Sequence, residues 1–185
     1  MSPVTVIVLA SGRGKRYLAS GGSGSKLQAL LAGKAVLQHT LAAVHASGLP
    51  WHLEDSGQAG MGDSIAAAVR STQHAGGWLI LPGDLPLIQS QTLLNVATAL
   101  QQHSVVVPSY AGQRGHPVGF ASDCRQALLD LSGEQGAVGV VRSRDAYELR
   151  VEDAGCIHDI DTLDDLRRAE RCLLAARQAK TGENG

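Results

Sequence analysis

Residues 4–26 constrain the fold more than any other part of the chain. Residues 4–10 form an uninterrupted apolar run with several β-branched members, which is typical of a strand buried on both faces of a parallel sheet. The run leads into residues 11–26, which are rich in glycine and carry arginine and lysine side chains. Glycine lets the backbone approach a ligand closely, and free N–H groups beside cationic side chains bind anions. We therefore predict a polyphosphate-binding loop directly after the first strand.

Strand-length apolar segments alternate with helical patterns along the rest of the chain. We expect strands near residues 51–54, 78–81, 104–107, 115–121 and 147–151, and helices near residues 36–46, 63–70, 90–102, 123–131 and 163–179. This alternation predicts an α/β fold with a mainly parallel sheet. Ligands of such sheets bind outside the carboxyl ends of the strands. That rule places four loops at one edge of the sheet: residues 11–26, 57–64, 82–86 and, if Ile157 closes a strand, 158–162.

Composition limits the classes of function. A chain of 185 residues suits a single domain, which we place at residues 1–179 with a frayed polar tail at 180–185. A formal net charge of −1 and an aromatic content of 3% give no support for nucleic-acid binding or for a role at a membrane surface. The three cysteines lack disulfide or zinc spacing, which fits a reducing cytoplasm. The apolar run at residues 4–10 is too short to span a bilayer.

The first loop does not follow either of two common phosphate-binding motifs. A Walker loop ends in Gly-Lys-Ser/Thr, whereas here the serine precedes Lys26. The dinucleotide fingerprint needs a third glycine after Gly12 and Gly14, and residues 15–17 (KRY) follow instead. An oxidoreductase with a dinucleotide-binding fold is therefore disfavoured.

Five stretches, in the same order along the chain, carry a family resemblance. The first is residues 9–17 (LASGRGKRY) with Lys26 and Leu27. Residues 60–65 (GMGDSI), 81–86 (LPGDLP) and 158–166 (HDIDTLDDL) supply three more. These four resemble the motifs of the MobA-like nucleotidyltransferases. The fifth, residues 114–120 (RGHPVGF) with 128–137 (LLDLSGEQGA) downstream, resembles the molybdenum cofactor cytidylyltransferase branch of that family.

The resemblance implies a fold and a reaction. The fold is a Rossmann-like three-layer sandwich of the nucleotide-diphospho-sugar transferase type. The reaction is a Mg²⁺-dependent transfer of a nucleoside monophosphate, with CMP from CTP favoured, to the phosphate of molybdopterin, with release of pyrophosphate. The implied partners are a nucleoside triphosphate, the phosphorylated pterin cofactor, and a molybdoenzyme or its chaperone.

The same motifs imply the site residues. Arg16, Lys26, Asp84 and Asp161 are expected to carry catalysis, and the two aspartates are expected to hold the metal. Substrate binding is expected from Leu9, Ala10, Ser11, Gly12, Arg13, Gly14, Gly62, Ser64 and His116.

Elementary chemistry agrees with these roles and leaves alternatives open. Mg²⁺ needs only one or two protein carboxylates besides phosphate oxygens and water, and Asp84 and Asp161 would provide two. Asp159 would point to the same face of an extended segment as Asp161, so it competes as the ligand. Asp84 could instead be a turn residue, Asp161 or Ser64 a helix-start residue, and His116 a structural loop histidine. No general base is required, because an acceptor phosphate is already anionic at neutral pH.

Two departures from the family pattern bear on function. Residues 19–25 lengthen the first loop, and we expect this insertion to be mobile without ligand. Residues 49–60 leave room for one short strand where the family has a strand, a helix and another strand. The sheet would then lack one βα unit near the nucleotide base and ribose.

Base selection and catalysis stay open at this point. Ser11 stands where guanylyltransferases of the family have glycine and cytidylyltransferases have alanine. The alternatives are a guanylyltransferase, or a non-catalytic relative that binds a nucleotide or pterin cofactor and delivers it to a partner. The retained Arg16, Lys26, Asp84 and Asp161 argue against a pure binding protein.

Overall fold

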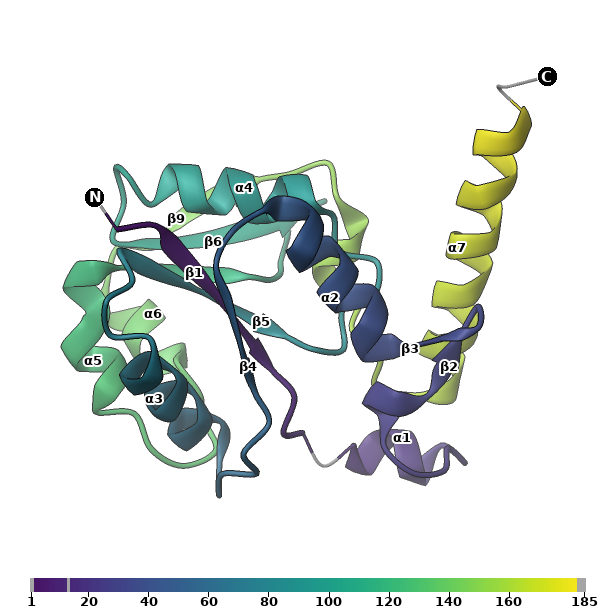
Figure 1. The fold of residues 1–185 in the computed structure, drawn as a ribbon, viewed down its shortest axis with the longest axis horizontal. Helices are drawn as coiled ribbons and strands as arrows, with labels where there is room; N and C mark the ends of the chain where they lie inside the picture. The colour runs from purple at the N-terminus through teal and green to yellow at the C-terminus, as the bar shows by residue number, and fades with distance from the viewer. Residues whose placement is uncertain (1, 13, 183–185) are drawn as a thin grey trace.

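A mixed sheet forms the centre of the molecule (Figure 1). The computed structural model describes residues 2–12 and 14–182. Within them the sheet has seven strands in the order β4-β1-β5-β8-β6-β7, and β9 pairs with β6. The strands are β1 Val4–Leu9, β4 Trp51–Glu54, β5 Gly77–Pro82, β6 Val105–Tyr110, β7 Gln113–Arg114, β8 Val118–Ala121 and β9 Tyr147–Arg150. β4, β1 and β5 are parallel, β9 is parallel to β6, and β7 and β8 run antiparallel to their neighbours.

The register of the parallel strands brings three loops to one edge of the sheet. Leu9, the last residue of β1, lies beside Pro82 of β5 and beside Glu54 of β4. All three residues end their strands. The segments that follow them therefore begin next to each other, as the rule for carboxyl ends of parallel strands predicts.

Helices cover both faces of the sheet. Val6 and Val8 of β1 are buried with residues of α2 (Val36–Ser47) and α4 (Ser90–Ala99) on one face. Ile7 is buried with residues of α3 (Met61–Ser71), α5 (Arg125–Leu129) and α6 (Val138–Ser143) on the other. Alternate residues of a strand point to opposite faces, so one strand serves both layers. The predicted Rossmann-like three-layer sandwich with a mainly parallel sheet is confirmed.

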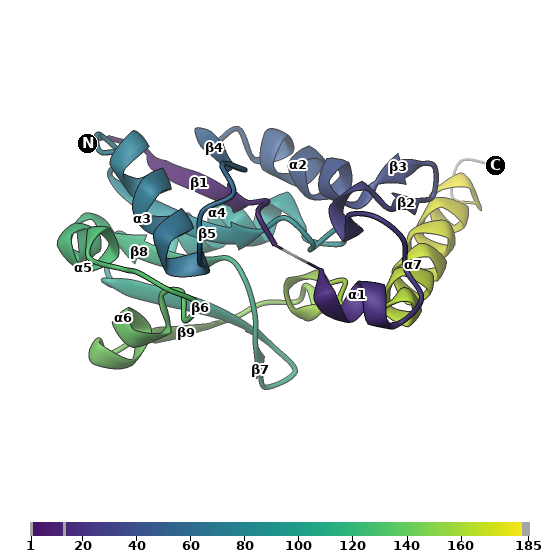
Figure 2. The same cartoon turned by 90° about the horizontal axis from the view of Figure 1, so that it is seen from below.

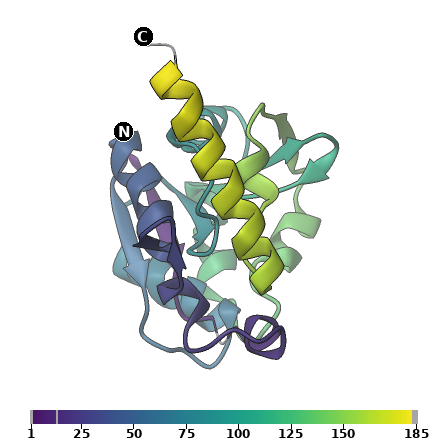
Figure 3. The ribbon, with the colours of Figure 1, turned by 90° about the vertical axis from the view of Figure 1, so that its right-hand side faces the viewer.

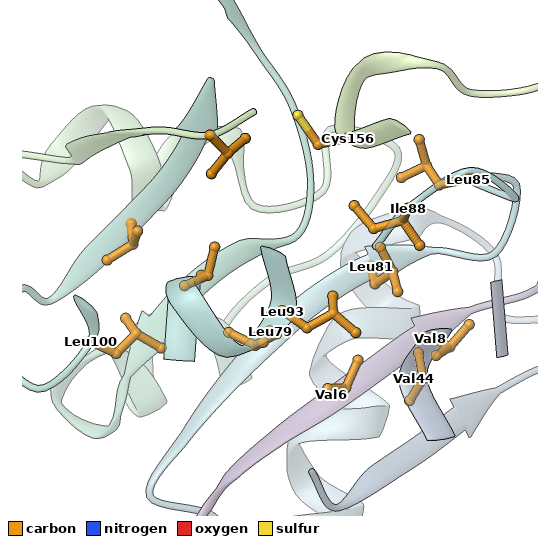
Figure 4. Close-up of a cluster of buried hydrophobic side chains, with 13 residues drawn as sticks. Val6, Val8, Val44, Leu79, Leu81, Leu85, Ile88, Leu93, Leu100 and Cys156 are labelled. Carbon is orange, nitrogen blue, oxygen red and sulfur yellow. The ribbon is translucent and has the colours of Figure 1, made fainter. Parts of the chain in front are cut away.

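The layer between α2, α4 and the sheet has an aliphatic core (Figure 4). Leu79 and Leu81 of β5 and Leu93 of α4 are fully buried there. The core reaches the site edge through Leu85 and Ile88, which lie between β5 and α4. Burial of these side chains stabilises the segment that carries Asp84.

The C-terminal helix α7 (Leu163–Gly182) packs at one end of the molecule. Ala169 of α7 is buried with Ile160, Val36 and Leu31. Leu31 belongs to a small hairpin of β2 (Leu30–Leu31) and β3 (Lys34–Ala35). The second half of α7 extends away from the sheet, whereas its first turn lies near α1 (Lys15–Ala19; Figure 3). Within the described residues, none of the helices is long and apolar enough to cross a membrane.

Thr162 caps α7. Its Oγ1 accepts from Asp165 N at 3.2 Å, and Asp165 Oδ2 accepts from Thr162 N at 2.8 Å. This reciprocal pair satisfies N–H groups at the helix start. Asp161 is therefore not needed as a cap, which leaves its carboxylate free for other partners.

Several predicted boundaries are wrong. Residues 15–19 form helix α1 inside the predicted loop. The condition that Ile157 closes a strand is not met, because residues 154–157 form a 3-10 helix. The predicted strand at 115–121 begins only at Val118, because the N–H of His116 bonds to Cys156 and Pro117 has no N–H to donate. α4 ends at Ala99, before the predicted end at residue 102, and α7 continues to Gly182.

The short region between α2 and α3 has the predicted form. In the described chain it contains β4, an edge strand of the sheet, followed by a loop at residues 55–60. A βα unit at this edge is therefore missing relative to the pattern that the sequence resembles.

Candidate active site

A cleft of about 570 Å³ opens at the carboxyl edge of β1 and β5. This volume lies in the usual range for small-molecule sites. Nine of the predicted site residues line it: Leu9, Ser11, Gly12, Gly14, Arg16, Lys26, Ser64, Asp84 and Asp161. The structure thus brings together residues from both ends of the chain.

Lys26 forms the polar centre of the cleft. Its Nζ lies 2.6 Å from Asp84 Oδ2 and 3.1 Å from Asp161 Oδ1. Arg16 donates to the other oxygen of Asp161 at 2.6 Å. Lys26 is largely buried, with 12% of its side chain exposed, whereas 80% of the Arg16 side chain is exposed. The lysine pairs are therefore screened less by solvent than the Arg16 pair.

This pairing stabilises the ammonium form of Lys26 and the carboxylate form of Asp161. Burial alone would lower the pKa of Lys26, but the Asp84 and Asp161 carboxylates outweigh it and raise the pKa. Partial burial alone would raise the pKa of Asp161, but Lys26 and Arg16 outweigh it and lower the pKa. An ammonium and a carboxylate thus face each other throughout the neutral range.

Three carboxylates form a cluster that suits a divalent cation. One oxygen each of Asp84, Asp159 and Asp161 lies within 4.8 Å of the others. Asp84 Oδ1 is buried without a hydrogen-bond partner among the described residues. Hard cations such as Mg²⁺ and Mn²⁺ prefer such oxygen ligands. The donor set therefore fits the implied metal, and Asp159 belongs to it beside Asp161.

Asp159 differs from its neighbours because it is the most exposed of the three. Partial burial raises its pKa, and the nearby charges of Asp84 and Asp161 act in the same direction. Like charges at short range disfavour ionisation. A cation between the three groups would relieve this repulsion.

Backbone hydrogen bonds fix Asp84 at the edge of the sheet. Gly83 N donates to Leu9 O at 2.9 Å, and Thr40 Oγ1 donates to Gly83 O at 2.9 Å. A Cβ at Gly83 would lie 2.9 Å from a Leu37 methyl and 3.0 Å from Leu9 O. This close approach needs glycine. Asp84 O accepts in turn from Ile160 N at 2.9 Å, which ties it to the segment that carries Asp159 and Asp161.

The first loop is held against α7. Gly14 has φ +55°, which favours glycine, and it precedes α1. Gly22 packs against the buried ring of Tyr17, and Ser20 Oγ accepts from Leu163 N at 3.0 Å. Figure 2 shows α1 beside the first turns of α7. The insertion that we predicted to be mobile therefore has packing contacts. The predicted binding residue Arg13 lies outside the described residues.

The opposite wall of the cleft comes from the start of α3. Ser64 is buried inside this helix and its hydroxyl lies 3.1 Å from that of Ser11. The N–H of Gly62 is already taken by Gly133 O at 2.8 Å, and a Cβ there would lie 2.8 Å from Ser132 O. Gly62 is thus a packing residue, because its N–H is unavailable to a phosphate.

Three predicted binding residues do not line this cleft: Ala10, Gly62 and His116. Ala10 N donates to Glu54 O at 2.9 Å, in continuation of the strand pairing. His116 Nδ1 is buried without a hydrogen-bond partner among the described residues. Burial lowers the pKa of His116, and the Asp84 carboxylate opposes this effect. The imidazole is therefore neutral at pH 7.

The cleft also includes side chains that the prediction missed, among them Lys15, Gln58, Met61 and Glu134. Glu134 arrives on the segment 132–136, which is packed over α3 by the Gly62–Gly133 bond and by Gly133 N donating to Asp63 Oδ2 at 3.0 Å. A family motif covers Glu134, but its position over α3 depends on pairing between distant segments. Only that motif could have indicated a role.

Comparison with solved structures defines the class first. Rv0371c from Mycobacterium tuberculosis has a TM-score of 0.78 and 24% identity, over 92% of this chain and 98% of that one. A second structure of Rv0371c is a complex with manganese. A nucleotidyl transferase from Methanothermobacter thermautotroptrophicus has a TM-score of 0.79 and 18% identity, over 95% of this chain and 100% of that one. The fold is that of nucleotidyltransferases.

The family follows from sequence. The model of the MobA-like NTP transferase domain matches residues 6–148, so the chain belongs to this family. The purine catabolism protein PucB of Bacillus subtilis is 30% identical over 127 residues, which are 66% of this chain and 62% of PucB. The chain therefore spans less than two thirds of the length of PucB. The predicted family resemblance is confirmed.

Proposed function

We propose that the protein is a Mg²⁺-dependent nucleotidyltransferase that transfers CMP from CTP to the phosphate of molybdopterin and releases pyrophosphate. The observation that carries the proposal is the contact of Lys26 with both Asp84 and Asp161 inside the cleft. A lysine that bridges two candidate metal ligands stands where cation and phosphates must meet. Family membership and the manganese complex of Rv0371c support a divalent metal.

The chemistry requires mainly positioning and charge stabilisation. An oxygen of the acceptor phosphate attacks the α-phosphorus, a new P–O bond forms, and the bond from the α-phosphorus to the bridging oxygen breaks as pyrophosphate leaves. Lys26 and Arg16 would bind the phosphate oxygens on which negative charge grows. Asp84 and Asp161, with Asp159 beside them, would hold the Mg²⁺. When bound, Mg²⁺ neutralises charge on the phosphates.

Although a βα unit is missing after β4, residues of the short loop that replaces it line the cleft. Gln58 and Ala59 of the short loop after β4 face it together with Met61. This supports an enzyme rather than a delivery protein, since a binding protein needs no bridged metal site. Cytosine is favoured over guanine by the branch resemblance alone. A cytoplasmic location and delivery of the product to a molybdoenzyme or its chaperone are parts of the same proposal.

The test is pyrophosphate release with Mg²⁺, molybdopterin and each of CTP, GTP and ATP. We expect release with CTP, and loss of about a hundredfold or more in Asp84→Asn, because metal charge stabilisation is worth several kcal/mol. Lys34→Ala is a matched control, since Lys34 is exposed on β3 and does not line the cleft. Release with GTP alone would favour the guanylyltransferase. Tight nucleotide binding without any release would favour the non-catalytic relative and contradict the proposal.

A further inference from the structure

Two buried polar atoms beside the carboxylate cluster have no hydrogen-bond partner among the described residues. They are Asp84 Oδ1 and His116 Nδ1. Leaving such an atom unpaired in the protein interior costs about 1–3 kcal/mol. Native structures rarely keep one without a functional reason. Here two occur on residues whose backbones both bond to the segment 156–160.

The backbone brings these two residues together. β5 and β8 pair antiparallel, with Ile80 beside Val118 at one end of the paired region. His116 precedes β8 and Asp84 follows β5 at this same end. One short segment then holds both: Cys156 O accepts from His116 N at 2.8 Å, and Ile160 N donates to Asp84 O at 2.9 Å. Neither residue can move away without breaking contact with this segment.

Gly115 tightens the same arrangement. A Cβ at Gly115 would lie 2.3 Å from Cys156 O and 2.8 Å from Cys156 C. Only glycine lets the chain approach so closely at this point. The segment between β7 and β8 is therefore held against Cys156, which fixes the backbone position of His116.

His116 is badly placed to touch a substrate. Its Nδ1 is buried, and the residue lines neither the cleft above nor a second hollow of about 400 Å³ on the other side of Asp161. Asp84, in contrast, uses Oδ2 for Lys26 and keeps Oδ1 free. Outer groups that bind the second atom of a metal-binding side chain commonly fix its orientation.

Resting on the proposed function, we infer that His116 is a positioning residue for Asp84. One water molecule between its Nδ1 and Asp84 Oδ1 holds the carboxylate so that Oδ2 faces the cation and the phosphates. His116 would then act on metal binding through Asp84 and would not bind the acceptor. This assigns the buried histidine a role different from the acceptor contact that the sequence suggested.

The test compares three variants of the full chain in Mn²⁺ binding, measured by the loss of the free-ion EPR signal with Mn²⁺ alone. His116→Leu removes both ring nitrogens. His116→Asn puts an amide close to where Nδ1 lies, whereas His116→Gln puts it close to where Nε2 lies, and an amide can donate or accept. We expect His116→Leu to weaken Mn²⁺ binding about tenfold or more, and His116→Asn, unlike His116→Gln, to restore it to within about threefold.

Several results would overturn the inference. Unchanged Mn²⁺ affinity in a folded His116→Leu variant, rescue by Gln instead of Asn, or no Mn²⁺ binding by the wild type would each do so. If His116→Leu does not fold by circular dichroism, the Asn and Gln variants decide alone, because a merely structural histidine would not separate them in this order. Normal Mn²⁺ results without any pyrophosphate release would refute the proposed function and leave the positioning role standing.

Discussion

At the scale of single residues, Lys26 occupies two of the carboxylates that could bind a cation. Its ammonium contacts Asp84 and Asp161, which are two of the three carboxylates that suit a cation. A metal ion and the ammonium compete for these carboxylates. The triphosphate offers Lys26 new partners, so we expect the nucleotide to release the carboxylates from Lys26 and to strengthen metal binding.

This exchange predicts opposite effects for one substitution. Lys26→Met should raise the affinity for Mn²⁺ without nucleotide by at least about tenfold, because it removes a positive charge next to the cluster. The same variant should transfer nucleotide far more slowly, because it has lost a phosphate-binding group. Mn²⁺ titration followed by EPR measures the first effect, and Lys34→Met is the control. Weaker Mn²⁺ binding in Lys26→Met would contradict the exchange.

Asp161 predicts a pH dependence of stability. Its folded-state pKa lies below the ordinary 3.8, so its pairing stabilises the fold above that pH and the contribution is lost as the pH falls through the folded pKa. The free energy of unfolding in urea should therefore differ most between wild type and Asp161→Asn near about pH 6, and the difference should shrink towards about pH 3. A difference that stays constant over this range would contradict the pairing.

Much of this chemistry could be predicted from the sequence. Asp84, Asp161 and Lys26 converge because strand-end loops of a parallel sheet share an edge. We predicted that three further residues bind the substrates: Ala10, Gly62 and His116. In the structure their backbone N–H groups donate to the carbonyl oxygens of Glu54, Gly133 and Cys156, respectively. Those bonds depend on which distant segments pair, and no local pattern encodes that.

At the scale of elements, the segment 132–136 closes the cleft over the start of α3. Gly60 and Gly62 allow this approach, since a Cβ on either would lie under 3.0 Å from the backbone of Ser132 or Gly133. The two helices that were easiest to predict, α2 and α3, have long apolar patterns. Helix α1 is short and lies in a glycine-rich segment, and Ser20 at its end bonds to Leu163 of α7, so tertiary contacts support it beyond its own propensity.

This packing predicts the effect of a small substitution. Gly62→Ala should push residues 132–136 off α3, lower the free energy of unfolding by about 1–3 kcal/mol, and raise the nucleotide KM by moving Glu134. Gly139→Ala in α6 is the matched control, because a Cβ there meets nothing within 4 Å. Urea unfolding and nucleotide titration measure the two effects. Equal behaviour of the two variants would contradict the role of the segment.

At the scale of the whole molecule, the site joins the first and last parts of the chain. Arg16 and Lys26 come from the first loop and Asp161 from just before α7, and their contacts span 145 and 135 residues of sequence. The alternation of strands and helices predicted the layers correctly. It did not predict that β8 inserts antiparallel between β5 and β6, because that pairing is decided by tertiary contacts.

The most direct test of the whole account follows phosphorus through the reaction. The protein is incubated with Mg²⁺ and molybdopterin, once with CTP labelled at the α-phosphorus and once with CTP labelled at the γ-phosphorus. Nucleotidyl transfer predicts that the α-label appears in the pterin product and the γ-label in pyrophosphate, and that Asp84→Asn and Asp161→Asn suppress both. An α-label that stays in CTP, or a γ-label that reaches the pterin, would contradict the account.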